Sequence, residues 1–184
     1  MEISRMSKVS PQLIIAIILI TLGVASRLLP HEANFAPIGA IALFGGVILG
    51  WKHALWLPLS AMIISDLFIG FYSGIGFTWV SFVLIALFGM TLKKAKLGKK
   101  IVVGGVVSAS IFFVVSNFGV WVSSGMYSHT LAGLIQCYTM AIPFFRMTLL
   151  SDLFYSGALF GLNAFAIYLV AKYSKVSSQS PYLH

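Results

Sequence analysis

The sequence predicts an all-α integral membrane protein with six transmembrane helices and both termini on the cytoplasmic side. Of its 184 residues, 59% are hydrophobic and 9% are charged, whereas soluble domains carry about 25% charged residues. A soluble globule of this size has to cover a large surface with polar groups, and this chain lacks them. The composition therefore excludes a disordered chain, a disulfide-stapled secreted domain and a nucleic-acid-binding domain.

Six apolar runs approach the length of about 20 residues that a membrane-crossing helix needs. They cover residues 13–29, 36–50, 53–71, 77–92, 101–122 and 148–171. The run at 36–50 is the shortest and would reach only about 22 Å as a helix, so we expect neighbouring helices to shield it. Its glycines suit close helix packing. Pro58 lies inside the third run and is expected to bend it.

The lysines and arginines predict the orientation of these runs. With the N-terminus inside, ten of the twelve fall on the inner side, and only Arg27 and Arg146 fall on the outer side. Positive charge favours the cytoplasmic side, so the net charge of +8 is explained by topology. The domain division that follows is a cytoplasmic segment at 1–12, a single membrane domain at 13–171 and a cytoplasmic tail at 172–184.

The first run has a competing interpretation as a cleaved signal peptide. Arg5 and Lys8 precede it, and residues 23–26 are an acceptable cleavage site. Five more runs follow, which favours an uncleaved first helix in a multi-pass protein.

Charged and polar residues inside the runs gather near their predicted outer ends. Arg27, Asp66, Asn117, Arg146 and Asp152 are expected at similar heights, in the outer third of the membrane. A charge within a span costs about 2.5–3.5 kcal/mol on insertion scales, so such residues persist where they pair, face water or bind something. The pattern predicts a polar pocket that opens outward above an apolar inner half.

The charged residues also have simpler interpretations, which the sequence leaves open. Asp66 could pair with Arg27 or Arg146 and hold helices together without contacting a ligand. Asp152 could complement the start of its own helix, and Arg27 could be a helix-end residue whose guanidinium reaches water. Arg146 is the stronger candidate for a ligand contact, because arginine binds phosphate and carboxylate groups in bidentate fashion.

Aromatic residues concentrate at the same outer ends, where membrane interfaces favour Trp and Tyr in any case. The aromatic residues expected to line the pocket and stack on a flat ligand are Tyr72, Trp79, Trp121 and Tyr138. Cys137 falls in a long outer connection at 123–147, which we expect to hold a short helix at the interface. Its simplest role is a small buried apolar residue, and the weaker alternative is a thiol ligand to a metal that the ligand carries.

No catalytic or cofactor motif was found. The chain contains no GxxxxGK[ST], HExxH, CxxC or GxSxG pattern, so we expect no cofactor, no protein metal site and no enzyme activity. The tetrapeptide Ser-Asp-Leu-Phe occurs at 65–68 and again at 151–154, as in a weak inverted repeat. Alternatives to a ligand-binding protein are a membrane enzyme in which Asp66 and Asp152 share a proton, and a structural subunit without a ligand.

Four segments together resemble a known type of protein. They lie at 34–46, 65–70, 117–121 and 143–146 and read NFAPIGAIALFGG, SDLFIG, NFGVW and PFFR. They resemble a family of small bacterial six-helix membrane proteins that is similar to the substrate-binding S-components of energy-coupling-factor vitamin transporters. Within that group the chain is nearest to the solitary S-component-like cobalamin transporters.

The resemblance implies an S-component-like bundle in the bacterial cytoplasmic (inner) membrane that takes up a vitamin-like molecule, cobalamin or a relative. The implied partners are the small-molecule ligand, the lipid bilayer and an energy-coupling module of ATPases with a transmembrane coupling subunit, but no nucleic acid. Two features depart from the pattern. Residues 71–79 lack the cysteine that can coordinate cobalt in cobalamin-type members, and residues 13–29 lack an Ala-x-x-x-Ala pair.

The expected site combines the residue pattern with the resemblance, which implies that Asp66 and Arg146 belong to the pocket. We expect Arg27 and Arg146 to hold anionic groups of the ligand. Asp66 and Asn117 are expected to form hydrogen bonds with it, while the aromatic side chains stack on its flat faces.

Overall fold

The computed structural model describes residues 10–178, and this part of the chain is helical with short connections. Its elements are α1 (Pro11–Leu28), α2 (Ile38–Phe44), the π-helix η1 (Gly45–Leu49), α3 (Trp51–Ala54), α4 (Trp56–Ile69), α5 (Ile75–Thr91), α6 (Leu97–Ser123) and α7 (Leu131–Ser178). Residues 1–9 and 179–184, which belong to the predicted cytoplasmic segments, lie outside the described residues.

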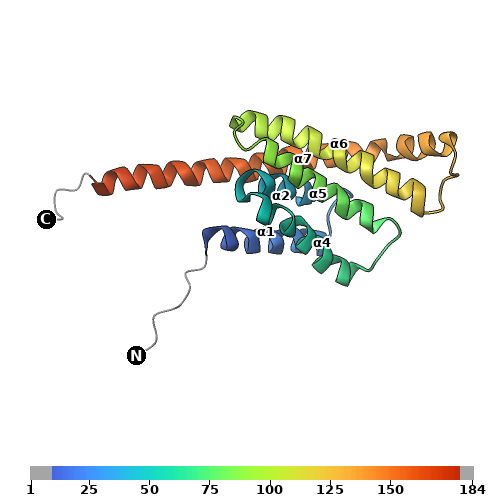
Figure 1. Cartoon of the computed structure of the whole chain (residues 1–184), viewed down its shortest axis with the longest axis horizontal. Coiled ribbons are helices and arrows are strands. Elements are labelled where there is room, and N and C mark those ends of the chain that lie inside the picture. The colour runs from blue at the N-terminus through green and yellow to red at the C-terminus, as the bar shows by residue number, and fades with distance from the viewer. Residues whose placement is uncertain (1–9, 179–184) are drawn as a thin grey trace, which may run out of the picture.

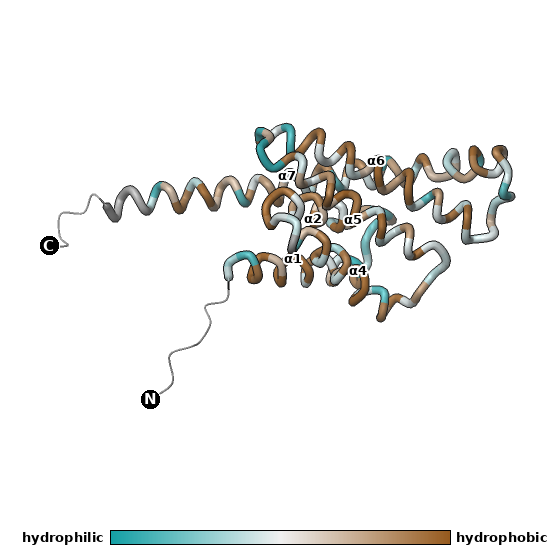
Figure 2. Tube along the Cα trace, in the orientation of Figure 1, coloured by the Kyte–Doolittle hydropathy of each residue, from teal (hydrophilic) through white to brown (hydrophobic). Residues whose placement is uncertain are grey.

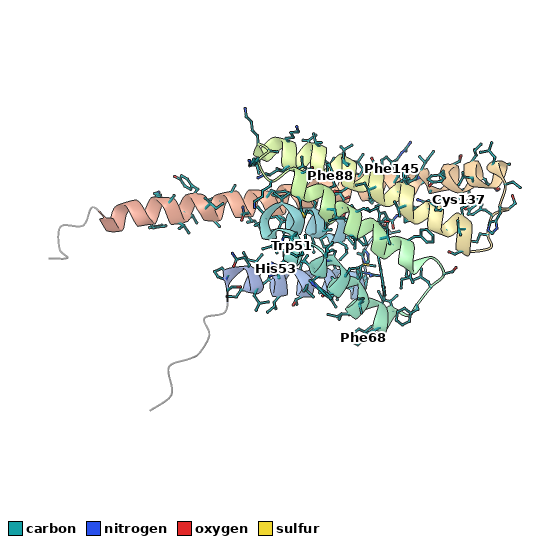
Figure 3. The ribbon with its side chains drawn as sticks, in the orientation of Figure 1. Trp51, His53, Phe68, Phe88, Cys137 and Phe145 are labelled. Carbon is teal, nitrogen blue, oxygen red and sulfur yellow. The ribbon has the colours of Figure 1, made fainter. Side chains whose placement is uncertain are left out.

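Within the described residues, three helices are long and apolar enough to cross a membrane: α1, α6 and α7 over Leu131–Tyr173. The segments Ile38–Leu49, Trp56–Ile69 and Ile75–Thr91 are apolar but shorter. Large apolar side chains stay exposed on the outward faces of the helices. One of them is Phe68 of α4, which is 74% exposed and lies at the edge of the molecule (Figure 3). Exposed apolar surface on this scale is unfavourable in water but suits contact with lipid. The structure therefore indicates a membrane protein.

The short segment formed by α2 and η1 lies at the centre of the molecule. Every residue at 37–49 is buried except Ile48, which is partly buried. The segment packs against α4, α5, α6 and α7, and α1 covers part of it (Figure 1). The expectation that neighbouring helices shield the shortest apolar run is confirmed.

Two glycines permit the close crossing between this central segment and α5. A Cβ atom added to Gly46 would overlap the backbone carbonyl oxygen of Ala86, and one added to Gly89 would lie 2.6 Å from the carbonyl oxygen of Leu43. The obstacle in each case is backbone, which cannot rotate away as a side chain can. Small residues at this crossing therefore set how closely the helices approach.

The helices run back and forth along the long axis of the molecule. The start of α1, the turn between α5 and α6 and the end of α7 lie toward the same end, at the left of Figure 1. The lysine-rich turn at that end is the hydrophilic patch between α5 and α6 in Figure 2. Both ends of the described chain therefore lie on the side of Lys93 and Lys94, as expected from the charge pattern.

The prediction for residues 123–147 is wrong. We expected a long connection with a separate short helix, but the connection is only residues 124–130, and α7 continues without a break from Leu131 through Pro143. Proline interrupts the hydrogen bonds of a helix locally without having to end it. At 1.5 Å per residue, the 48 residues of α7 span about 72 Å, so its ends extend beyond the ~30 Å hydrocarbon layer.

The third predicted run is divided at Leu55 into α3 and α4. Pro58 lies in the first turn of α4, where it has no backbone N–H to offer to the carbonyl of Ala54 at the end of α3. The distortion expected from Pro58 is thus present, but as a break one turn earlier rather than as a bend in mid-helix.

Candidate functional site

A buried charge cluster joins three helices. Arg27 in the last turn of α1 donates from Nη2 to Oδ1 of Asp66 in α4 at 2.5 Å, and Trp79 in α5 donates from Nε1 to Oδ2 at 2.8 Å. The Asp66 side chain is 0% exposed and that of Arg27 is 14% exposed. Both carboxylate oxygens are thus occupied. Of the two arginines considered as partners for Asp66, the structure selects Arg27.

A hollow of about 270 Å³ opens beside this cluster, between the connection at 29–37 and helices α1, α2, α4, α5, α6 and α7. The polar and ionisable side chains on its wall are Arg27, His31, Asn34, Tyr72, Thr78, Thr148 and Asp152. A second hollow of about 260 Å³ adjoins it and is shared between α5, α6 and α7. The two have four lining residues in common: Asn34, Thr78, Phe112 and Thr148.

Asp152 projects from the middle of α7 onto the start of α2. Its side chain is 2% exposed and touches Gly39, where an added Cβ would overlap Oδ1. The backbone N–H of Ala40 donates to the carboxyl group, whereas Oδ2 has no hydrogen-bond partner among the described residues. The expectation that Asp152 complements the start of its own helix is wrong, because α7 begins at Leu131.

The neighbouring Ser151 fixes the approach of α7 to the connection before α2. Its Oγ donates to the carbonyl oxygen of Ala36 at 2.9 Å, across 115 positions of the chain. The bond holds α7 in register with the residues that face Asp152. Such side-chain links between distant segments specify one packing arrangement when their polar groups are satisfied.

The predicted site residues divide into two groups, and the first group lines the hollows or belongs to the cluster of Arg27, Asp66 and Trp79. Arg27 and Tyr72 line the first hollow, and Asn117 lines the second. The Nδ2 atom of Asn117 donates to the carbonyl oxygen of Phe113 one turn earlier in its own helix. Asp66 and Trp79 lie behind Arg27 and outside the walls of both hollows.

The second group lines neither hollow and lies outside that cluster. Arg146 is exposed and has no ion-pair partner within residues 10–178. Trp121 donates from Nε1 to the carbonyl oxygen of Ser128, and the Tyr138 hydroxyl donates to the carbonyl oxygen of Val114. These three side chains therefore stand on the α6–α7 hairpin rather than beside Arg27.

Cys137 is buried in the contact between α6 and α7. It is 2% exposed, and its Sγ donates to the carbonyl oxygen of Asn117 at 3.4 Å. Figure 3 places it with Phe145 on the half of α7 that runs beside α6. No group of three or more metal-ligating side chains occurs in the described part of the chain.

Sequence reasoning missed the uncharged polar residues that the two hollows share. Asn34 adopts a positive φ of 61° in the connection before α2, and Thr78 and Thr148 lie on helices beside it. An isolated threonine in an apolar run carries little signal, since its hydroxyl can bond to the preceding turn, as Thr148 does to the carbonyl of Phe144. Asparagine tolerates a positive φ better than most residues, so the residue type of Asn34 was the only signal that the sequence offered.

The first, second and fourth positions of the repeated tetrapeptide have the same burial in both copies. Ser65 and Asp66 are buried while Phe68 is exposed, and Asp152 is likewise buried while Phe154 is exposed. The partners differ, however, because Asp66 has two strong donors and Asp152 retains a free oxygen. No hydrogen bond joins the two carboxyl groups, so they do not form a proton-sharing pair in this structure.

The arrangement brings a neutralised ion pair and an incompletely satisfied carboxyl group to one hollow in an apolar bundle. A site of this kind can hold a small molecule through a few directed polar contacts while aromatic and aliphatic side chains cover the rest. The model of DUF6580, described as a family of unknown function, matches residues 7–176. No curated protein and no solved structure matches the chain.

Proposed function

The chain belongs to the DUF6580 family, and we propose that it binds a small molecule in the hollow beside Arg27 and Asp152 and takes part in its uptake across the membrane. One observation carries the proposal. The hollow combines ionisable, hydroxyl and amide side chains inside a bundle whose other buried residues are mostly apolar. Polar groups inside a membrane domain are expensive, and they are retained where they serve a solute path or a binding site.

We propose a multi-pass S-component-like bundle of six spans in a bacterial inner membrane, with the lysine-rich end in the cytoplasm. The hollows, of about 270 and 260 Å³, lie just below the usual range of about 300–1,000 Å³ for ligand pockets. These small volumes favour a small vitamin-like ligand. Cobalamin would require the two hollows, which share a wall at Thr78 and Thr148, to join and widen. An energy-coupling module is the proposed partner, since the chain has no nucleotide-binding loop.

The proposed orientation predicts which positions a membrane-impermeant thiol reagent can reach. In a Cys137→Ser background, Met126→Cys between α6 and α7 should be labelled on intact cells. Lys94→Cys in the turn between α5 and α6 should be labelled only after permeabilisation. In the unaltered protein, Cys137 is expected to stay unlabelled both before and after permeabilisation, because it is 2% exposed. The reverse pattern at Met126 and Lys94 would show that the bundle is inserted the other way.

Binding is expected to be detectable on the purified full-length protein. A vitamin panel that includes cobalamin should contain a ligand that raises the melting temperature, by roughly 5–10 °C at a hundredfold excess over its Kd. Thr78→Trp places a bulky ring on the wall common to both hollows and should abolish that shift. Thr91→Trp is the matched control, because it makes the same change at an exposed position at the other end of α5.

Two outcomes of this experiment count against the proposal. One is a panel in which no compound binds at any concentration up to millimolar. The other is a ligand whose binding survives Thr78→Trp, which would move the site elsewhere on the protein. The alternative of an enzyme built on Asp66 and Asp152 predicts turnover that either Asp→Asn change abolishes, and a structural subunit predicts no ligand at all.

A further inference from the structure

One group on the wall of the first hollow has hydrogen-bonding capacity that the protein leaves unused. Asp152 is 2% exposed, and its Oδ2 accepts no hydrogen bond from any described residue. Buried polar side-chain atoms are satisfied in the large majority of cases. Asp152 lines the hollow, so a molecule bound there lies beside this carboxyl group.

The backbone of α2 holds the carboxyl group in place. Gly39 lets it approach the helix backbone closely, and the N–H of Ala40 bonds to it. Ser151, the preceding residue, is tied to the carbonyl oxygen of Ala36. A carboxyl group positioned in this way needs little reorganisation to accept a further hydrogen bond, which is the property of a preorganised binding group.

The charges around the hollow favour a cation over an anion. The titratable side chains on its wall are Arg27, His31, Tyr72 and Asp152. The guanidinium of Arg27 is already neutralised by Asp66 at 2.5 Å, and His31 is exposed, with Nδ1 2.9 Å from the carbonyl oxygen of Leu29. An anionic group in the hollow would find no unpaired arginine or lysine on this wall.

The aromatic side chains of the same wall suit the same chemistry. Phe82 and Phe112 stack with ring centroids 5.2 Å apart and an interplanar angle of 29°, and Tyr72 completes the aromatic part of the lining. The faces of aromatic rings carry partial negative charge, so they attract cations as well as flat rings.

We infer that the ligand presents a positively charged N–H donor to Asp152, as a protonated amine or a cationic heteroaromatic ring would. The inference rests on the proposed binding function and narrows its ligand class. It also replaces the expectation that Arg27 and Arg146 hold anionic groups, because Arg27 is paired and Arg146 lies outside the hollow.

The test compares probes of the same size and different charge on the full-length protein in nanodiscs. The probes are 3-(aminomethyl)pyridine, which is cationic when its amine is protonated, neutral nicotinamide and anionic nicotinate. A vitamin panel sorted by charge is measured separately in the same way. The amine is expected to bind about tenfold or more tightly than the amide, since charge-assisted hydrogen bonds exceed neutral ones. Asp152→Asn, which keeps the shape of the side chain, should remove this preference, and Arg146→Gln should leave it unchanged.

The outcomes separate this inference from the proposal beneath it. If the best ligand is an anion, or if Asp152→Asn leaves the preference for the amine intact, the cationic class is refuted while small-molecule binding stands. If neither probes nor panel bind, the binding function itself fails and the inference fails with it. Comparing the affinities of cationic, neutral and anionic ligands for the unaltered protein tests the inference even if the Asp152 variant does not fold.

Discussion

Replacing Asp66 with alanine is expected to lower the free energy of unfolding by about 3–5 kcal/mol, the usual effect of breaking a buried ion pair by removing one partner. The guanidinium of Arg27 would lose its only ion-pair partner among the described residues while only 14% of its side chain is exposed. The indole N–H of Trp79 would lose its acceptor as well. Unfolding of the purified protein by heat or by a denaturing detergent measures the change.

Two further variants separate the ion pair from the hydrogen bond. Trp79→Phe removes only the N–H donor and should destabilise by about 1.5–3 kcal/mol at most. The double variant Arg27→Met with Asp66→Leu replaces the pair by apolar residues and should recover most of the lost stability. If Asp66→Ala is no more harmful than Trp79→Phe, the ion pair does not hold the three helices together.

The second large effect is expected at the crossing of the central segment with α5. Gly46→Ala should destabilise the protein by about 1–3 kcal/mol or more, because the added Cβ meets the carbonyl oxygen of Ala86 and the helices have to separate. The yield of folded protein and its thermal melting report the effect.

The adjacent Gly45 supplies a control in the same π-helix. A Cβ added there would lie 3.7 Å from Cδ1 of Leu57, an ordinary van der Waals contact. Gly45→Ala should therefore be neutral or slightly stabilising, by at most about 1 kcal/mol from the better helix propensity of alanine. Equal destabilisation by Gly45→Ala and Gly46→Ala would mean that the close approach to Ala86 is not what requires glycine.

Much of the fold could be predicted because hydrophobicity, run length and glycine content are properties of short stretches of sequence. Each long helix contains one of the predicted apolar runs, although the first part of α7 was predicted to be a connection. The glycines in 36–50 indicated a closely packed segment. The sequence was misleading at Pro143, which resembles a helix boundary but lies inside α7. Whether a helix continues through a proline depends on the packing that surrounds it, and no local pattern contains that information.

The candidate site was only partly predictable for a related reason. Counting residues along the predicted spans placed Arg27, Asp66 and Asp152 at similar depths in the membrane. In the structure Arg27 pairs with Asp66 and lines the same hollow as Asp152. Which of them pair is determined by the rotation of each helix about its axis. Arg146 and Asp66 were expected to share a pocket, yet Arg146 is exposed and Asp66 is enclosed by Arg27 and Trp79.

The amino-acid sequence by itself determined that this chain is an apolar helical protein with membrane character, because hydrophobicity, run length and the placement of lysines are properties of short segments. Only the tertiary structure decided that Arg27 is neutralised and that Asp152 keeps an unsatisfied oxygen beside a hollow. The physical reason is that pairing and cavities arise from contacts between helices far apart in the chain. Those contacts depend on angles and registers that the order of residues does not show directly.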